Sequence, residues 1–155
     1  MTVPFRIALA IAVFSTLGGV AFAQSTQRNF ASEETNRKLV VEFYDRFFNK
    51  HETAEAAQVV ADDYKQHNPN VPDGKQVFVS FFTKMFKDNP ERRSRIVRSA
   101  TDGDLVYLHV HSQLNANDLG SAIVDIFRVK DGKIVEHWDV VQKVPEKAAN
   151  QNTMF

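Results

Sequence analysis

Groups able to move protons gather in the last third of the chain, in segments that otherwise have the pattern of β-strands. His109 and His111 stand in "LVYLHVHSQL", Asp125 interrupts the apolar run "SAIVDIFRV", and His137 stands in "KIVEHWDVVQKV". A carboxylate beside an imidazole can take a proton from a carbon next to a carbonyl group and return a proton to a developing alkoxide. A buried strand tolerates such residues only when they are paired or in use, whereas a strand facing solvent tolerates them freely.

The turn between the first two of these segments decides which side chains meet. If it is centred on Asp118, His111 lies opposite Asp125, and directly opposed residues share one face of a sheet. That face would carry Tyr107, His109, His111, Gln113, Asp125 and Phe127, and the other face would carry Val106, Leu108, Val110, Val124 and Ile126. We therefore expect Asp125 to shuttle a proton, while His111 orients it or donates to a substrate oxygen. The alternative is a structural Asp–His hydrogen bond in a pocket that only binds.

The last hairpin, at Asp131-Gly132, allows two registers. A two-residue turn places Trp138 opposite Asp125. A three-residue turn with a left-handed Gly132 shifts the register by one, so that His137 faces Asp125 and Glu136 joins Arg128 on the other face. The second register is favoured because it keeps that charged pair outside.

The elements that must position these residues follow from periodicity. Three helices are expected: one after Ser32, with apolar side chains three and four residues apart; a short one over Thr53 to Ala61; and one after Asp73 that ends at Asn89-Pro90. From Arg92 the period changes to two, and four strands follow with turns between them. Helices followed by an antiparallel meander predict an α+β fold, with the sheet curled over the helices around a pocket.

The remaining composition narrows the class of protein. Residues 1–23 have the basic start, apolar run and A-x-A ending of a signal peptide, so we expect an exported protein, periplasmic or secreted. Residues 24–31 read as a flexible lead-in, and residues 32–155 as one domain. Nineteen basic residues balance nineteen acidic ones, which argues against nucleic acid and, after signal cleavage, a membrane as partners. The chain has no cysteine, which excludes disulfides and thiolate chemistry.

Further residues are candidates for contacting a substrate. His67 and Asn68 precede Pro69 on a loop, where they can either bind a carbonyl group or pack and cap a turn. Tyr44 belongs to the core face of its helix, with its hydroxyl able to reach a cavity. The candidate substrate-binding residues are His67, Asn68, His109, His137, Trp138, Phe127 and Tyr44. The histidines lack a metal-ligand spacing, so no metal is expected. The basic run Arg92 to Arg98 fits a solvated strand face or dimer rim better than an anion site.

Three segments together carry a resemblance to a known family: "YKQHNPNVPDGK", "DIFRVKDGKIVEHWDVVQKVPE" and the closing "NQNTMF". The chain resembles the SnoaL-like polyketide cyclases of the nuclear-transport-factor-two-like superfamily. The resemblance implies a cone-shaped α+β barrel, usually dimeric, and aldol condensation without metal or cofactor. It also implies a strand aspartate as general acid/base beside a histidine on the neighbouring strand, and these positions match Asp125 and His111.

The resulting functional prediction is an exported, cofactor-independent acid/base enzyme acting on a small hydrophobic carbonyl compound, of the aldol condensation, isomerase or dehydratase type. The alternative is a non-catalytic periplasmic binding or scaffold protein on the same fold. A homodimer through the sheet is expected, because the valines and other apolar residues assigned to its outer face require a cover.

Overall fold

A computed structural model describes residues 28–155 of the chain. The predicted signal peptide (1–23) and the first half of the predicted lead-in (24–27 of 24–31) lie outside the described residues. Within residues 28–155, no helix is long and apolar enough to cross a membrane.

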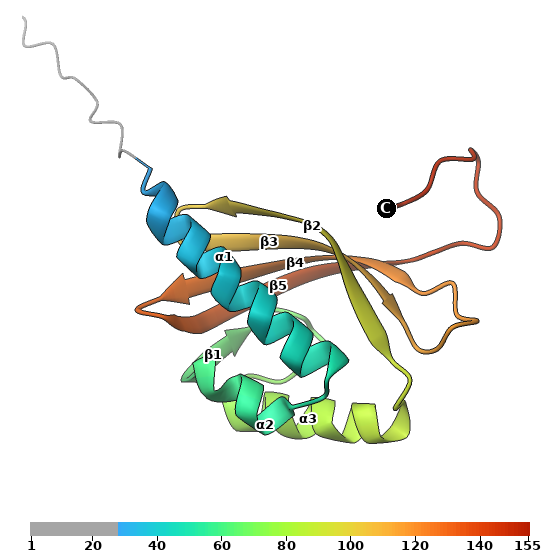
Figure 1. The fold of residues 1–155 in the computed structure, drawn as a ribbon. Helices are drawn as coiled ribbons and strands as arrows, with labels where there is room; N and C mark the ends of the chain where they lie inside the picture. The colour runs from blue at the N-terminus through green and yellow to red at the C-terminus, as the bar shows by residue number, and fades with distance from the viewer. Residues whose placement is uncertain (1–27) are drawn as a thin grey trace, which may run out of the picture.

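The helices and strands follow the expected order (Figure 1). The helical elements are α1 (Phe30–Tyr44), the π-helix η1 (Asp45–Asn49), α2 (Thr53–Ala56), the 3-10 helix η2 (Ala57–Val59) and α3 (Lys75–Asp88). The strands are β1 (Val60–Gln66), β2 (Arg93–Asp102), β3 (Leu105–Gln113), β4 (Ser121–Lys130) and β5 (Lys133–Lys143). The predicted α+β class is thus confirmed.

The sheet has the strand order β1-β5-β4-β3-β2. Strands β2 to β5 form the predicted antiparallel meander, and β1 adds to the β5 edge in parallel. The sheet curves without closing, and α1 crosses its inner face, with α2 and α3 near β1 (Figure 1). Helix α1 begins one turn earlier than expected, because the Asn29 side chain accepts a hydrogen bond from the Ser32 N–H and acts as the N-cap. Asp73 does not cap α3; it accepts a hydrogen bond from the Gln66 N–H instead.

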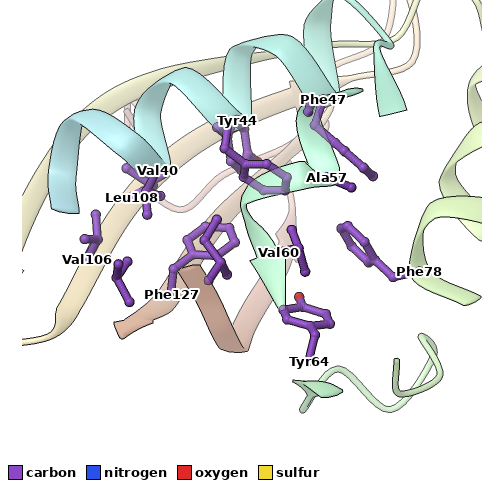
Figure 2. Close-up of a cluster of buried hydrophobic side chains, with 14 of the residues drawn as sticks. Val40, Tyr44, Phe47, Ala57, Val60, Tyr64, Phe78, Val106, Leu108 and Phe127 are labelled. Carbon is purple, nitrogen blue, oxygen red and sulfur yellow. The ribbon is translucent and has the colours of Figure 1, made fainter. Parts of the chain in front are cut away.

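Aromatic side chains fill the space between the helices and the sheet (Figure 2). Phe47 of η1 is 0% exposed and stacks on Phe78 of α3 at 4.7 Å between ring centroids. On the other side, Val106 and Leu108 of β3 are fully buried near Val40 of α1. The inner face of the sheet is therefore covered by helices of the same chain.

Val106, Leu108 and Val110 were expected on the outer face of the sheet, and that expectation is wrong. All three are 0% exposed inside the core. They consequently need no second subunit to cover them, and the dimer remains a prediction without this basis. Val124 and Ile126 do lie on the outer face, as expected; Val124 is 41% exposed there, and Val140 of the neighbouring strand is 70% exposed.

Gly120 precedes β4 in a position that only glycine fits. Its φ is +78°, and an added Cβ would lie 2.3 Å from the main-chain oxygen of Ser112. Gly103 has a similar φ of +61° but open space around the added atom. We expect Gly103→Ala to cost about 1–2 kcal/mol of unfolding free energy, the cost of a left-handed alanine. Gly120→Ala should cost about 1–3 kcal/mol more, because of the added clash.

Urea unfolding of the two glycine variants, followed by circular dichroism, measures this difference directly. Gly103→Ala is the matched control, since it changes the same atoms at a similar φ without a neighbour to strike. Equal losses of stability in the two variants would contradict the packing assigned to Gly120.

Candidate active site

A cavity of about 650 Å³ lies between the helices and the inner face of the sheet. Its apolar walls include Phe48 of η1 and Phe81 and Phe82 of α3. Its polar groups include Asp125 of β4 and His137 of β5. A concave, mostly apolar site with a few converging polar groups is the usual form of a small-molecule site.

Asp125 lies at the centre of these polar groups and is only 5% exposed. The Tyr44 hydroxyl donates to Asp125 Oδ2 at 2.9 Å, and His137 Nε2 lies 3.0 Å from Asp125 Oδ1. Tyr44 ends α1 where the π-helix η1 begins, and such π segments are frequent at functional sites. Two separate elements, α1 and β5, thus hold the one carboxylate of β4.

The hydrogen bonds of His137 determine which ring nitrogen carries a proton. Its Nδ1 lies 2.9 Å from Gln66 Oε1, and that same oxygen accepts the main-chain N–H of Asn68 at 3.0 Å. The Asn68 N–H can only donate, so the atom of Gln66 at this place is the oxygen, and His137 Nδ1 must donate to it. One proton must therefore lie between His137 Nε2 and Asp125 Oδ1. Without it, the lone pair of the nitrogen would face a lone pair of the oxygen, and the two would repel each other. The pair holds a single transferable proton inside the cavity.

Tyr44 acts as a fixed donor in this arrangement. Burial raises the pKa of Tyr44 well above its ordinary value, and the Asp125 carboxylate acts in the same direction, opposed by Arg92 and the Ser94 hydroxyl. The phenol consequently remains protonated and keeps its hydrogen bond to Asp125 at neutral pH. Burial also raises the pKa of Tyr64, so its hydroxyl, which accepts from Gln66 Nε2 at 3.2 Å, is neutral as well.

A second carboxylate, Asp139, lies opposite Asp125 in the sheet. The Asn68 amide Nδ2 lies 2.8 Å and 2.7 Å from its two oxygens. One atom each of Asp125, His137 and Asp139 lies within 4.8 Å of the others, so these residues could together hold a metal ion. Within the protein, the same atoms are satisfied by the shared proton and by Asn68.

The predicted pairing of His111 with Asp125 is wrong. Asp125 lies opposite Leu108, and His111 lies opposite Ala122, three residues from the expected register. The loop from 114 to 120 is not a turn centred on Asp118, because the Asp118 carboxylate accepts the N–H groups of Leu114 and Gly120 and pulls the loop to one side. An odd shift turns every side chain to the other face. The expected catalytic role of His111 beside Asp125 therefore does not hold.

Both histidines of β3 lie on the outer face. His111 Nε2 lies 2.9 Å from the Leu119 carbonyl oxygen, and its ring stacks on Phe155 at 4.1 Å. His109 Nδ1 lies 2.8 Å from Arg98 Nη1. The expected contact of His109 with a substrate in the cavity is thus not possible in this arrangement.

The last hairpin has neither of the two expected registers, although the favoured one assigned His137 and Glu136 to the correct faces of the sheet. Its turn has two residues, Asp131 and Gly132, both with positive φ. A bulge at Val135 then adds one residue to β5, so that Arg128 lies opposite Glu136, with 3.0 Å between Arg128 Nε and Glu136 Oε2. Asp139 consequently lies directly opposite Asp125, where the favoured register expected His137, and His137 shares the inner face with Asp125 from the position opposite Phe127.

The other candidate residues divide between the two faces of the sheet. Phe127 and Asn68 line the cavity. Trp138 lies opposite Ile126 on the outer face, where its ring stacks on His67 at 4.6 Å, and both residues point away from Asp125. His67 lies 2.9 Å from Glu136 Oε1, so it packs on the surface and does not line the cavity.

Two important residues were missed by the sequence analysis. Gln66 fixes the proton on His137, and Asp139 supplies the second carboxylate. The alternation of β5 could have indicated Asp139, since it lies two residues after His137 on the same face. Nothing in the sequence marked Gln66, because its contact with His137 depends on β1 pairing with β5.

Comparison with known proteins places this site in a family. The model of the SnoaL-like polyketide cyclases matches residues 38–149. None of the curated proteins that were compared matches the chain.

Solved structures share the fold at low identity. A putative ketosteroid isomerase from Kribbella flavida is 20% identical, with a TM-score of 0.62 over 77% of this chain and 86% of that one. A putative polyketide cyclase from Bacillus cereus is 23% identical, with a TM-score of 0.60 over 71% of this chain and 76% of that one. A SnoaL-like protein of unknown function from Burkholderia thailandensis is 13% identical, with a TM-score of 0.61 over 70% of this chain and 96% of that one. At these identities the likeness establishes the fold alone.

Proposed function

This chain belongs to the SnoaL-like polyketide cyclase family, and from that premise we propose that its cavity catalyses acid/base chemistry on a small hydrophobic carbonyl compound, without a cofactor. The observation that carries the proposal is the contact between Asp125 and His137 inside the cavity, 3.0 Å long and holding one proton. His137 takes the place that the sequence analysis gave to His111. In agreement with the sequence-based expectation, we further propose that the protein acts after export.

The proposed first step is removal of a proton from the carbon next to the carbonyl group. The Asp125 carboxylate takes this proton, and the electrons of the C–H bond move into an enolate. His137, with both ring nitrogens protonated, donates its Nε2 proton to the enolate oxygen. The Nδ1 proton stays on His137, in its hydrogen bond to Gln66 Oε1, so only the Nε2 side takes part in the transfer. Aldol condensation, isomerisation and dehydration can all begin with this step.

The surroundings of Asp125 support this step. Phe48, Phe82 and Phe127 line the cavity and exclude water from the reacting atoms. In such surroundings the fixed donor Tyr44 and the His137 ring stabilise charge more strongly than they would in water.

Exchange of carbon-bound hydrogen for deuterium tests the proposal before a substrate is known. The purified protein is incubated in D₂O with a panel of small aryl and alkyl ketones and keto acids, and proton NMR follows the signal of the carbon next to the carbonyl. We expect at least one compound to exchange faster than in buffer, with saturation at high concentration. No exchange above buffer across the panel would contradict the acid/base function.

A non-catalytic binding protein is the second candidate function. The observation that favours it is that both Asp125 oxygens already have protein partners, Tyr44 and His137. A protein of this kind would bind members of the same panel without exchanging their hydrogen. The exchange experiment, combined with binding measured by calorimetry, therefore separates the two candidates.

A further inference from the structure

Arg92 brings a guanidinium group into the same cavity as Asp125. It directly precedes β2, and strand alternation puts it on the same side as the buried Ser94. Its main chain is held at both ends: the N–H donates to the Asn89 oxygen at 3.1 Å, and the carbonyl accepts from His51 Nε2 at 3.2 Å. The side chain therefore enters the cavity from a fixed point.

The guanidinium has fewer partners than its burial requires. Its Nη2 donates to Ser112 Oγ at 3.0 Å, but its Nε is buried without a hydrogen-bond acceptor in the described part of the chain. Among residues 28–155, no carboxylate oxygen lies within 4.0 Å of it. Arg128, the other arginine with a buried Nε, has Glu136 Oε2 at 3.0 Å. Arg92 as a whole is half-buried, and a partly desolvated guanidinium without a carboxylate partner is less stable than a paired one, so a ligand carboxylate would supply the missing partner.

Two titratable groups act on Arg92 without forming an ion pair with it. Asp118 is within electrostatic range, but both of its oxygens are bound to main-chain N–H groups of its own loop. Tyr44 is neutral, as described above. Burial lowers the pKa of Arg92 from its ordinary value, in agreement with a desolvated position, yet a guanidinium remains charged in proteins. The cation is thus available to an anion that enters the cavity.

We propose that Arg92 binds a carboxylate of the substrate, so that the site accepts a hydrophobic keto acid in preference to a neutral ketone. The inference rests on the proposed function, since Asp125 is taken to act on the carbonyl group of the same molecule. The apolar wall, which includes Phe82 and Leu119, holds the hydrocarbon body. The planar guanidinium donates charge-assisted hydrogen bonds to the carboxylate through its terminal Nη1 and Nη2 groups, which unlike Nε are not sealed from the cavity.

Arg92 differs in this respect from the basic run that follows it. Arg93 and Arg95 are exposed, and Arg98 contacts His109 on the outer face. The sequence pattern by itself indicated a solvated face or dimer rim for the whole run. The structure separates its first member, which points inward, from the others.

Matched probes test the inference by binding alone. Calorimetry of the purified protein at neutral pH and low salt compares 2-naphthoate with 2-naphthamide, which have the same shape but differ in charge. We expect the wild type to bind the carboxylate at least about 10-fold more tightly, the effect of a charge-assisted hydrogen bond. Arg92→Met should bring the two affinities within about 2-fold by weakening naphthoate alone, and Arg92→Lys should keep part of the preference. Arg95→Met is the matched control and should bind as the wild type.

The inference is overturned if wild-type protein binds naphthoate no better than the amide, or not at all. It is overturned equally if Arg92→Met keeps the preference. The affinities of the wild type for naphthoate and the amide test the inference even if a variant fails to fold. Asp125→Asn should retain the preference for the carboxylate, so a protein that shows the preference but no deuterium exchange would refute the acid/base function and leave the anion site standing.

Discussion

Replacing Asp125 with asparagine should reduce deuterium exchange by about 10²–10⁴-fold, the usual contribution of general acid/base catalysis. Asparagine has the same shape but cannot accept the proton. The hydrogen bonds around it survive, because an amide oxygen still accepts from Tyr44, and the amide N–H₂ can donate to His137 Nε2. The variant should therefore fold normally and lose only the chemistry. Exchange rates measured by NMR with the most active compound of the panel give the result.

Asp63→Asn is the matched control for this experiment. Asp63 is an exposed residue of β1, and its substitution makes the same change in charge. We expect wild-type exchange from this variant. Full exchange by Asp125→Asn, with a circular dichroism spectrum like that of the wild type, would remove Asp125 from the mechanism.

Truncation of Phe47 to alanine should lower the free energy of unfolding by about 3–5 kcal/mol, the range for a buried phenylalanine. Its ring is 0% exposed and packs on Phe43 at 5.2 Å, on Phe78 at 4.7 Å and on Phe86 at 6.1 Å. The Phe47 ring thus connects α1 and η1 with α3, and an alanine at this position would leave a cavity between these helices. Domains of this size are stable by only about 5–15 kcal/mol, so the variant should be close to unfolding at 37 °C. Urea unfolding followed by circular dichroism measures the loss.

Phe30→Ala removes the same atoms from a side chain that is 71% exposed, and it should change stability by less than about 0.5 kcal/mol. Phe47→Leu keeps most of the buried volume and should lose about 1.5 kcal/mol or less, so it remains measurable if the alanine variant does not fold. Similar losses in Phe30→Ala and Phe47→Ala would show that the aromatic cluster does not carry the stability assigned to it.

The sequence by itself determined the elements and their order. A spacing of three and four residues between apolar side chains indicated α1 and α3, and a spacing of two indicated β2 to β5, because both periods are local properties of the chain. The same local pattern singled out Asp125 as a polar residue in an apolar strand. The positive φ values at Asp131 and Gly132 likewise follow from a local Asp-Gly turn.

Only the tertiary structure decided what surrounds Asp125. Its partners lie 12 positions away, at His137, and 81 positions away, at Tyr44. Which histidine reaches it depends on the bend of the 114–120 loop and on the bulge at Val135, and a shift by one residue at either place exchanges the two faces of a strand. Periodicity carries no information about such shifts. The separation of Arg92 from the arginines that follow it, and the selection of His137 over His111, therefore became visible only when the strands were paired.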